Sequence, residues 1–367
     1  MITVLHTESS QGWGGQERRT LRECQGLLAR GARPIVLCQP GSVLAQRAAE
    51  ASIEVRTCRM RRSFDVFAVA AIARLIRAEG VDIVNTHSGR DSLLAGLAGR
   101  LSRRRPVIVR TRHLALPITS KMSYSVLPHR VVTVSEFVRG YLIQRGVPAE
   151  RVIAIPTGID CARFQRDGVE SGLRKEWGID PIAPLVGTVA ILRYKKGHHI
   201  LLGAIPQVLA AMPEARFVFA GDGPQQANLA AKIAAMGLEG KVLLLGLRRD
   251  IPSVLNAIDL FVLPTLEEAL GTSYLEAMAA GKAVIGTSVG GVGEVVRPSC
   301  NGYLVPANDP VALAQAIILA LRDPAHLHAM GQAGRAQAGA EFSLGRMCDR
   351  MLTLYTDLLA ARAARRL

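Results

Sequence analysis

The alternation of short β-branched runs with longer amphipathic stretches constrains this 367-residue chain more than any other feature. The run ITVLH is followed by the helical stretch RRTLRECQGLLARG, and then come PIVLCQ, VFAVAAIARLIRAEG and DIVNTH. Apolar strands separated by helices are typical of a parallel sheet that helices cover on both faces. The sequence therefore predicts an α/β fold built from βαβ units.

The alternation occurs twice along the chain. It stops at a turn-rich passage, VIAIPTGIDCARFQRDG (152–168), and restarts with LVGTVAIL, ARFVFAGDG, KVLLLGL, DLFVLP and AVIGTS. A chain of this length can form two domains. We expect two Rossmann-like domains, residues 1–165 and 170–346, facing each other across a deep cleft. The last stretch, about 347–367, reads as a basic amphipathic helix that either packs back onto the first domain or touches a membrane surface.

The formal net charge of +15 is shared unevenly. Residues 1–160 hold 24 Lys and Arg against 12 Asp and Glu, whereas residues 161–367 hold 21 against 18. Two clusters, RMRR (59–62) and SRRRPVIVRTR (102–112), stand out in the first half. Such clusters face nucleic acid, anionic lipid or a phosphorylated substrate, or they are simply solvated.

Targeting signals and metal motifs are absent from the sequence. No uncharged apolar run reaches the roughly 18 residues of a membrane-spanning helix, and the start lacks the basic flank and cleavage site of a secretory signal. The six cysteines form no CxxC pair, so neither a zinc site nor a disulfide framework is indicated. We expect a cytoplasmic protein.

The stretch GWGGQERR follows the first predicted strand and opens the first helix. Gly14 and Gly15 either allow backbone N–H groups to approach an anion or a sugar, or form a plain tight turn. A third glycine of the dinucleotide fingerprint is missing, because Glu17 stands in its place. A nicotinamide cofactor is therefore not indicated.

A second basic loop, RYKKGHH, follows a strand of the second half. Arg193 and Lys196 together suit a diphosphate, since a guanidinium binds two oxygens at once and an ammonium adds a point charge. The adjacent histidines have no carboxylate or cysteine at ligand spacing, so a metal site is not indicated there.

Two glutamates further along the chain lie in a loop and in the first turns of the helix that follows it. Glu268 lies in TLEEALG, the loop after the strand DLFVLP, and Glu276 lies about one turn inside the helix TSYLEAMAAG. The first N–H groups of such a helix, at Gly271, Thr272 and Ser273, can hold a phosphate. A carboxylate just beyond them can accept two hydrogen bonds from a ribose diol. This layout suits a sugar nucleotide, whereas acids that merely favour a helix N-terminus explain only one of the two glutamates.

Nearly the whole chain resembles the family-four retaining glycosyltransferases, which have the GT-B fold. The motifs that carry this resemblance are GWGGQE, DIVNTH, VVTVSE, IPTGID followed by Phe164, KGHHILL, GDGP, LFVLPTLEEALG with LEAMAAGKAVIGT, and GGVGEVV. The glutamate pair with AMAAG behind it is the most specific of them. The resemblance implies a donor that is a nucleotide-diphosphate sugar, used as substrate, with no other cofactor.

The resemblance also implies roles for single residues. Glu276 would hold the donor ribose, and Glu268 would bind the transferred sugar near the reacting carbon without acting as a nucleophile. The diphosphate would be neutralised by Arg193 and Lys196 and supported by the backbone of Gly271, Thr272 and Ser273. Gly14 and Gly15 would close over the donor, and His87 would touch its sugar. Leu247 and Arg248 would lie beside its base. Retention of anomeric configuration is likewise an implication of the family.

The chain departs from the family pattern at two positions. Many relatives carry arginine at the position of Ile191, where the nearest arginine here is Arg193, and Gly293 stands where proline is common, which would loosen that loop. No Asp-x-Asp pair occurs in the sequence. Cationic side chains and helix N-termini would then stabilise the leaving diphosphate, so we expect no metal.

The resemblance also implies that the basic first half binds the acceptor. Arg59, Arg61, Arg62 and Phe64 suggest an edge that docks on the anionic inner face of the cytoplasmic membrane. With TRHLALP (111–117), this resembles transferases of lipopolysaccharide or other surface polysaccharide, so we expect a lipid-linked glycan acceptor.

Three other interpretations are weaker. A nucleotide-sugar epimerase shares the two-domain architecture. A nucleic-acid binder would explain the positive charge, but the chain has 16 aromatic residues and no recognisable binding module, so no nucleic-acid partner is expected. A glycogen-type phosphorylase would need a pyridoxal-lysine segment, which nothing here resembles.

Overall fold

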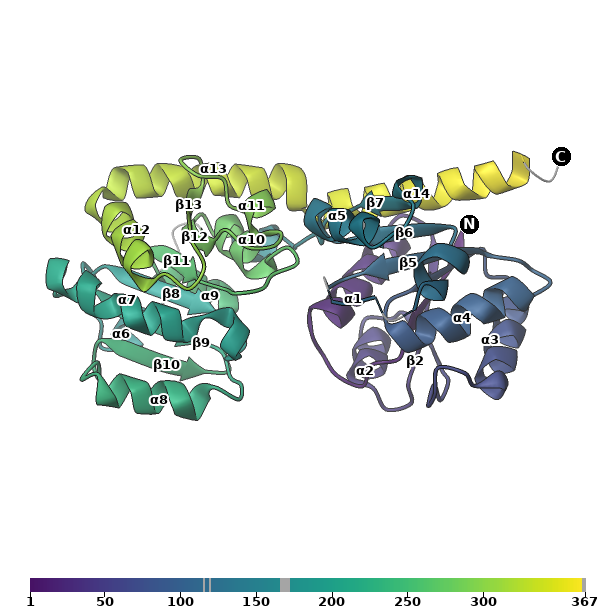
Figure 1. Ribbon diagram of the computed structural model, residues 1–367, viewed down its shortest axis with the longest axis horizontal. Coiled ribbons are helices and arrows are strands. Elements are labelled where there is room, and N and C mark those ends of the chain that lie inside the picture. Colours follow the sequence, from purple (N-terminus) through teal and green to yellow (C-terminus); the bar gives the residue numbers. More distant parts are fainter. Residues whose placement is uncertain (115, 119, 166–171, 365–367) are drawn as a thin grey trace. The chain divides into compact units, whose positions relative to one another are not determined.

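The computed structural model describes residues 1–114, 116–118, 120–165 and 172–364 (Figure 1). The chain separates into two compact units. Unit 1 comprises Met1–Gly158 and Leu344–Leu367, and unit 2 comprises Ile159–Ser343.

Unit 1 is built on a parallel sheet of seven strands within the described residues. The strand order is β3-β2-β1-β4-β5-β6-β7, and every pairing is parallel. The strands are β1 (Thr3–Glu8), β2 (Arg33–Cys38), β3 (Glu54–Thr57), β4 (Ile83–Thr86), β5 (Val107–Arg112), β6 (Arg130–Thr133) and β7 (Val152–Ala154). The α/β prediction is confirmed for this half.

Helices cover both faces of this sheet. Successive residues of a strand point to opposite faces, so each strand contributes apolar side chains to the core on both sides. Val4 of β1 packs in the same cluster as Leu27 of α1, whereas its neighbour Leu5 packs with Ile72 of α3 on the other face. The helices of the unit are α1 (Gly15–Leu28), α2 (Val43–Glu50), α3 (Val66–Ala78), α4 (Gly89–Leu101), α5 (Glu136–Gln144) and α14 (Leu344–Ala364). Burial on both faces explains why these strands are apolar throughout.

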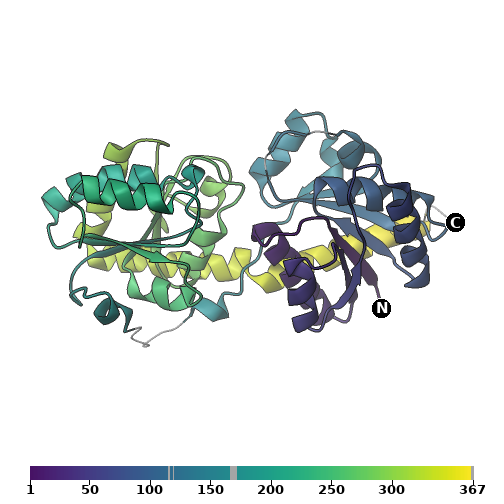
Figure 2. The same ribbon diagram turned by 90° about the horizontal axis from the view of Figure 1, so that it is seen from below.

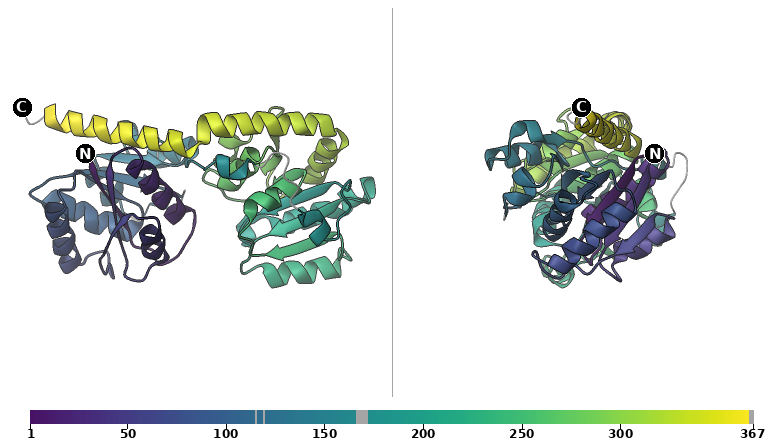
Figure 3. Two further views of the ribbon diagram at one scale, coloured as in Figure 1. Left: turned by 180° about the vertical axis from the view of Figure 1, so that it is seen from behind. Right: turned by 90° about the vertical axis from the view of Figure 1, so that its right-hand side faces the viewer.

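The last helix of the chain, α14, is part of the core of unit 1. Met347, Met351 and Tyr355 of α14 are buried among residues of the sheet. Figures 2 and 3 show this yellow helix passing the purple helix α1. A side chain at Gly26 of α1 would force α14 or the Cys348 side chain to shift, because its Cβ would lie 2.2 Å from Cys348 Sγ. The apolar face of α14 is therefore used for packing and is not available to a membrane.

Unit 2 repeats the architecture with a six-stranded parallel sheet in the described part of the chain, in the order β10-β9-β8-β11-β12-β13. Its strands are β8 (Leu185–Val189), β9 (Arg216–Ala220), β10 (Val242–Gly246), β11 (Leu260–Leu263), β12 (Ala283–Thr287) and β13 (Gly302–Val305). Its helices are α6 (Leu173–Glu176), α7 (His198–Ala211), α8 (Gln226–Ala235), α9 (Ile251–Ala257), α10 (Thr272–Ala279), α11 (Val292–Val295), α12 (Pro310–Arg322) and α13 (Pro324–Phe342). The second Rossmann-like half is thus confirmed.

The strands of unit 2 also bury both faces. Phe217 and Phe219 of β9 join the core under α7 and α8, while Ala220 packs with Val254 of α9 on the opposite face. Phe261 of β11 meets Tyr274 of α10 edge to face, with ring centroids 5.6 Å apart. This contact fixes α10 against the strand that precedes it.

One sequence expectation needs correction. The passage from Val152 was interpreted as turn-rich, but its first three residues form β7, the strand at one end of the sheet, paired with β6. A three-residue strand leaves too short a pattern to stand out from its turn-forming neighbours.

Each sheet has one point where the strand order reverses. In unit 1 the chain runs outward from β1 to β3 and then places β4 on the other side of β1. In unit 2 it runs outward from β8 to β10 and then places β11 beside β8. Ligands of open parallel sheets bind beyond the carboxyl ends of the strands at such points.

Two further observations concern the chain as a whole. No helix in the described ranges combines the length and the apolar character needed to cross a bilayer. All six cysteines are free thiols, and Cys300 is the one whose side chain is exposed.

Candidate active site

An ion pair occupies the strand-order reversal of unit 2. Lys196 follows β8, Glu268 follows β11, and Lys196 Nζ donates to Glu268 Oε2 over 2.5 Å. Each of these side chains is 17% exposed. The two residues are far apart in sequence and meet because β8 and β11 are adjacent. A solvent-accessible pair of opposite charges is therefore present where the fold places a ligand.

The loops that carry this pair are bonded to each other. The short 3₁₀ turn η4 (Tyr194–Lys196) accepts two bonds at the carbonyl of Lys195, from the N–H of Leu266 over 2.7 Å and from the hydroxyl of Thr265 over 2.9 Å. Thr287, at the end of β12, donates to the carbonyl of Thr265 over 2.5 Å. The loops after β8 and β11 and the end of β12 are thus held as one structure.

Close backbone approaches make glycine necessary at this site. Gly197 has φ +72°, and a Cβ there would lie 1.8 Å from the carbonyl oxygen of Pro264. Gly290 has φ +55°, and its Cβ would lie 1.9 Å from the carbonyl oxygen of Glu268. Side chains at these positions would push the loops apart. The glycines therefore set the position of both members of the ion pair.

Helix α10 begins directly after the Glu268 loop. Its N-cap is Gly271, with φ +97°, and Thr272 and Ser273 are its first two residues. The N–H groups of a first helical turn have no partner inside the helix. Glu276 is the fifth residue of α10 and is half-buried. The structure thus has a helix start at Gly271 with a carboxylate one turn later, in the order that the sequence predicts.

The side chains of three other predicted site residues of unit 2 make no bond to the ion pair within the described ranges. The side chain of Arg193 is exposed and has no ionic or hydrogen-bond partner there, although its backbone carbonyl accepts a bond from the N–H of Lys196 over 2.9 Å. Leu247 is 67% exposed. Arg248 makes two bonds to Asp250, of 2.9 and 2.7 Å, and one to Glu176 of 3.2 Å. The bonds to Asp250 raise the pKa of Arg248 and fix the direction of its side chain.

The structure also locates the two residues at which the chain departs from the family pattern. Ile191 is 42% exposed in the loop that leads to Arg193. Gly293 lies inside the short helix α11, not in a loop, so the expectation of a loosened loop at that position is wrong.

In unit 1, His87 lies at the corresponding reversal, immediately after β4. It is the middle member of a row of three buried histidines. His6 Nδ1 lies 3.1 Å from His87 Nε2, and His87 Nδ1 lies 3.1 Å from His113 Nε2. Burial lowers the pKa of all three rings. Since each neutral ring carries one N–H, the two contacts run in the same donor direction, and the three tautomers are coupled.

Asp91 holds the backbone at His87. Its carboxylate accepts bonds from the N–H groups of His87 and Ser88, each over 2.9 Å, and from the hydroxyl of Thr7 over 2.9 Å. Burial raises the pKa of Asp91, and it raises the pKa of nearby Glu8 to about 8, with the charge of Asp91 adding to the shift. The end of β1 and the start of α4 therefore form one buried polar cluster.

The glycines predicted to close over a donor follow β1. The N–H of Gly14 donates to Glu17 Oε2 over 2.8 Å, and Gly14 has an ordinary extended conformation. A Cβ at Gly15 would meet no atom within 4 Å. The fold of unit 1 does not itself require glycine at either position.

Sequence reasoning singled out His87 but missed His6 and His113. The signal that could have found them is their position along the chain. His6 lies in β1 and His113 directly follows β5, and these are the two strands on either side of β4. Among the described residues, no group of three or more His, Cys, Asp or Glu side chains has the geometry of a metal site.

Comparison with known protein families identifies the chain. Residues 13–163 match Glycosyltransferase Family 4, and residues 170–337 match Glycosyl transferases group 1. The chain belongs to the family 4 glycosyltransferases.

Two of the relatives that the chain matches are bacterial mannosyltransferases. The chain is 34% identical over 211 residues to a GDP-mannose-dependent monoacylated alpha-(1-6)-phosphatidylinositol monomannoside mannosyltransferase of Corynebacterium glutamicum, covering 54% of this chain and 55% of the relative. It is 30% identical to the lipopolysaccharide core biosynthesis mannosyltransferase LpsB of Rhizobium meliloti, covering 55% of this chain and 60% of the relative. The chain thus spans little more than half the length of these two relatives.

A longer alignment exists with an Escherichia coli enzyme, UDP-Gal:alpha-D-GlcNAc-diphosphoundecaprenol alpha-1,3-galactosyltransferase. It is 26% identical over 313 residues and covers 80% of each chain. These relatives are transferases by name, so the epimerase interpretation has no support.

Solved structures establish the fold of this glycosyltransferase. A glycosyltransferase from Rickettsia africae matches with a TM-score of 0.90 and 24% identity, covering 98% of both chains. HepE of Anabaena, determined in complex with UDP, matches with a TM-score of 0.87 and 22% identity, covering 97% of this chain and 100% of HepE. The predicted GT-B fold is confirmed.

Proposed function

We propose that this glycosyltransferase moves a sugar from a nucleotide-diphosphate sugar to a lipid-linked glycan acceptor, with retention of anomeric configuration and without a metal ion. The setting we propose is lipopolysaccharide or surface polysaccharide assembly at the inner face of the cytoplasmic membrane. Among the relatives, one is a lipopolysaccharide core mannosyltransferase and another acts on a diphosphoundecaprenol-linked sugar, according to their names.

The observation that carries the proposal is the ion pair at the strand-order reversal of unit 2. Lys196 and Glu268 lie next to the unpaired N–H groups that open α10, and Glu276 follows one turn later. A diphosphate needs cations and N–H donors, and a ribose diol needs a carboxylate. The three requirements of an activated sugar are met within two adjacent loops and one helix.

The donor groups are assigned to residues as follows. Lys196 and Arg193 neutralise the diphosphate, and the backbone of Gly271, Thr272 and Ser273 adds hydrogen bonds to it. Glu276 binds the ribose, and Glu268 binds the transferred sugar. Leu247 and Arg248 lie beside the base, with His87 contributing to the sugar and Gly14 and Gly15 to closure over the donor.

The role of Glu268 follows from its partner. A carboxylate that accepts a bond from an ammonium over 2.5 Å has a lone pair engaged and its negative charge stabilised, which weakens it as a nucleophile. We therefore assign Glu268 to positioning and to stabilisation of charge. The leaving phosphate itself accepts the acceptor's proton as the acceptor oxygen attacks from the same face, which retains the configuration.

Charge stabilisation without a metal is supported by the residues at this site. Lys196, Arg193 and the first turn of α10 supply the positive charge and dipole that a metal ion would otherwise supply. The test is activity in excess EDTA, where full transfer is expected and loss of transfer that Mg²⁺ or Mn²⁺ restores would overturn the metal-independent part.

Exposed apolar side chains support the membrane setting. Phe64, Val66 and Phe67 are 73%, 74% and 83% exposed at the start of α3. They adjoin the exposed Arg62, and we propose that this edge meets anionic lipid. Aromatic and basic side chains together are suited to the head-group region of an anionic leaflet.

Two experiments test the proposal. A thermal-shift screen of nucleotide sugars, including UDP-glucose and GDP-mannose, should find a ligand that at 100 times its dissociation constant adds about 2.7 kcal/mol of stability. NMR of the product should show the donor's anomeric configuration, and inversion would overturn the retaining mechanism.

For the membrane, isolated membranes should hold the enzyme at low salt and release it at high salt. The variant Phe64→Ser with Phe67→Ser should remain in the supernatant, while Leu319→Ser, an exposed apolar residue of unit 2, should behave as wild type. Absence of membrane association at low salt would end the docking proposal.

A further inference from the structure

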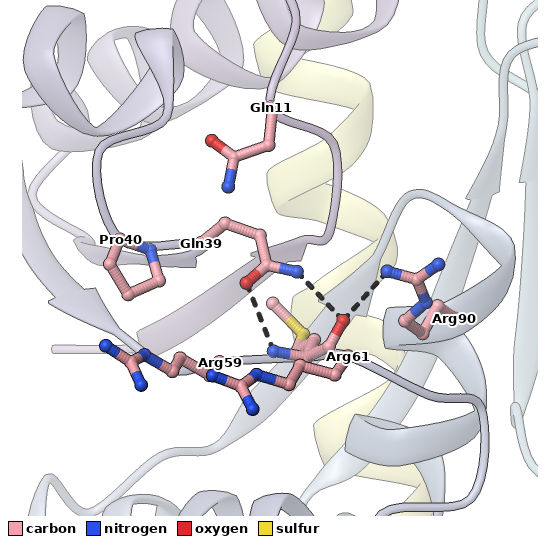
Figure 4. A pocket seen from close by; sticks show the side chains of 7 residues that line it. Gln11, Gln39, Pro40, Arg59, Arg61 and Arg90 are labelled. Atoms are coloured by element: carbon pink, nitrogen blue, oxygen red, sulfur yellow. Dashed lines mark hydrogen bonds between the residues drawn. The ribbon is translucent and has the colours of Figure 1, made fainter.

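Unit 1 contains a pocket of about 510 Å³ that the roles assigned above do not use. It is lined by Gln11, Gln39, Pro40, Arg59, Met60, Arg61 and Arg90 (Figure 4). Its volume lies within the roughly 300–1,000 Å³ that is usual for small-molecule sites.

The pocket lies beyond the carboxyl ends of the strands. Gln11 follows β1, Gln39 follows β2, Arg59 follows β3, and Arg90 lies in the first turn of α4, which follows β4. It therefore adjoins the strand-order reversal between β1 and β4, the part of a parallel sheet where ligands bind. The residues that form it come from four separate segments of the chain.

The backbone of Met60 is the centre around which the pocket is built. The side chain of Met60 is fully buried in the core under α3 and α4. The amide of Gln39 donates to the Met60 carbonyl over 2.8 Å and accepts from the Met60 N–H over 3.1 Å. Arg90 donates to the same carbonyl over 2.8 Å, and Figure 4 shows both side chains converging on it. This anchoring leaves Arg59 and Arg61, on either side of Met60, exposed.

The charge around the pocket is not neutralised. Among its described lining residues three are arginines and none is acidic. Within the described ranges, Arg59 and Arg61 have no ion pair, and Arg90 uses one of its five N–H donors for Met60. By contrast, Arg33 and Arg56, on β2 and β3 of the same sheet, are bound by Glu54 and Glu79 at 2.6 to 3.3 Å. Unit 1 thus contains one set of arginines that is neutralised and one set that is left positive.

We propose that this pocket binds a phosphate or diphosphate group carried by the acceptor. This inference rests on the transfer function proposed above and narrows its acceptor to phosphorylated glycans. Guanidinium groups bind phosphate oxygens in pairs, so three of them around one cavity favour a multiply charged anion. The volume admits a sugar residue along with its phosphate, and the amide of Gln11 offers both a donor and an acceptor to sugar hydroxyls.

The donor and the lipid head groups also carry phosphate, and the experiment must distinguish their binding from that of the acceptor. The donor diphosphate is assigned to Lys196 in unit 2, and lipid head groups are assigned to the edge at Phe64. Each makes a distinct prediction in the experiment that follows, because each depends on different residues.

The experiment measures binding of glucose 6-phosphate to the full chain by titration calorimetry, with methyl glucoside as the uncharged match. The test variant is Arg59→Gln with Arg61→Gln. The control, Arg77→Gln with Arg103→Gln, changes two exposed arginines of unit 1 outside the pocket lining and removes the same charge. Each protein is also titrated with UDP and GDP and tested for sedimentation with phosphatidylglycerol vesicles.

We expect wild type to bind glucose 6-phosphate but not methyl glucoside, and the test variant to bind it at least tenfold more weakly. The control should bind it within about twofold of wild type, and nucleotide binding should persist in both variants.

Equal binding in the test variant and wild type would overturn the proposal, as would competition between glucose 6-phosphate and a nucleotide, which would place the anion in unit 2. A test variant that loses vesicle binding beyond the control while it still binds glucose 6-phosphate would assign these arginines to the membrane instead. Failure of every nucleotide to bind would contradict the transfer function separately, since the pocket is measured with its own ligand.

Discussion

The strand-order reversals of the two units are built alike but carry opposite chemistry. In unit 1, His6, His87 and His113 form a neutral row that is almost completely buried. In unit 2, Lys196 and Glu268 form a charged pair that keeps contact with solvent. A neutral hydrogen-bonding row suits uncharged sugar hydroxyls, whereas exposed charges suit a diphosphate. One fold, used twice, can therefore supply the two kinds of contact that sugar transfer needs.

The largest expected effect comes from removing the cation of unit 2. Lys196→Met should lower kcat/KM by about 10²–10³, the usual cost of losing one group that stabilises transition-state charge. The matched control is Lys195→Met, whose backbone carbonyl holds the loops while its side chain is not part of the ion pair. Steady-state kinetics check the prediction. Equal losses of kcat/KM in the two variants would mean that activity depends on the total positive charge of the loop and not on the position of Lys196.

The next effect compares glycines in the two units. Gly197→Ala forces a Cβ to within 1.8 Å of Pro264 O in a left-handed conformation, which should cost about 1–3 kcal/mol of stability and weaken nucleotide binding. Gly15→Ala meets no atom within 4 Å and should leave the melting temperature unchanged or slightly higher. If Gly15→Ala nevertheless slows transfer, a substrate must approach that backbone closely. Denaturant unfolding and calorimetry measure both variants.

A smaller effect is expected at the histidine row. His87→Gln should lower kcat by about tenfold while nucleotide affinity stays within about twofold, because the contact that we propose for His87 is to the sugar. His6→Gln disrupts the row but keeps His87. It therefore distinguishes a direct contact of His87 with the sugar from a structural role of the row. Equal losses in both variants would assign His87 a purely structural role. His326→Gln, at an exposed position of α13, is the control for the substitution itself.

The smallest effect concerns pH. The folded pKa of Glu8 is raised to about 8 from 4.5, so the protonated form is favoured on folding. Its contribution to stability is greatest below pH 4.5 and is lost as the pH rises toward 8. Glu8→Gln should therefore stabilise the protein at pH 8, by on the order of 1–3 kcal/mol, and leave it nearly unchanged at pH 4.5. Unfolding in denaturant at both pH values checks this, with the exposed Glu150→Gln as control; a gain at pH 4.5 equal to that at pH 8 would contradict the assignment.

Much of this architecture was predictable because it depends on local pattern. Strand and helix periodicity predicted both sheets, and the rule that ligands bind beyond strand ends pointed to Lys196 and Glu268, whereas His87 came from the family resemblance. What periodicity does not contain is strand order. The direct bond between Lys196 and Glu268 requires β8 to lie beside β11, and no local pattern specifies that pairing.

The remaining features escaped prediction for the same physical reason. His6 and His113 are single histidines in or after apolar strands, and each gains meaning only from a neighbour on another strand. The arginine pocket joins Arg59 and Arg61 to Arg90 through the backbone of Met60, a contact across loops. From sequence, these arginines could be identified only as part of a basic surface.

The measurement that tests the central claim most directly is calorimetric titration of nucleotide-diphosphate sugars into wild type and Glu276→Ala. We predict that at least one such sugar binds wild type, that Glu276→Ala weakens it more than tenfold, and that Glu267→Ala, an exposed neighbour of Glu268, leaves it unchanged. Binding to Glu276→Ala as tight as to wild type, or no binding to wild type by any nucleotide-diphosphate sugar, would contradict the assignment of unit 2 as the donor site.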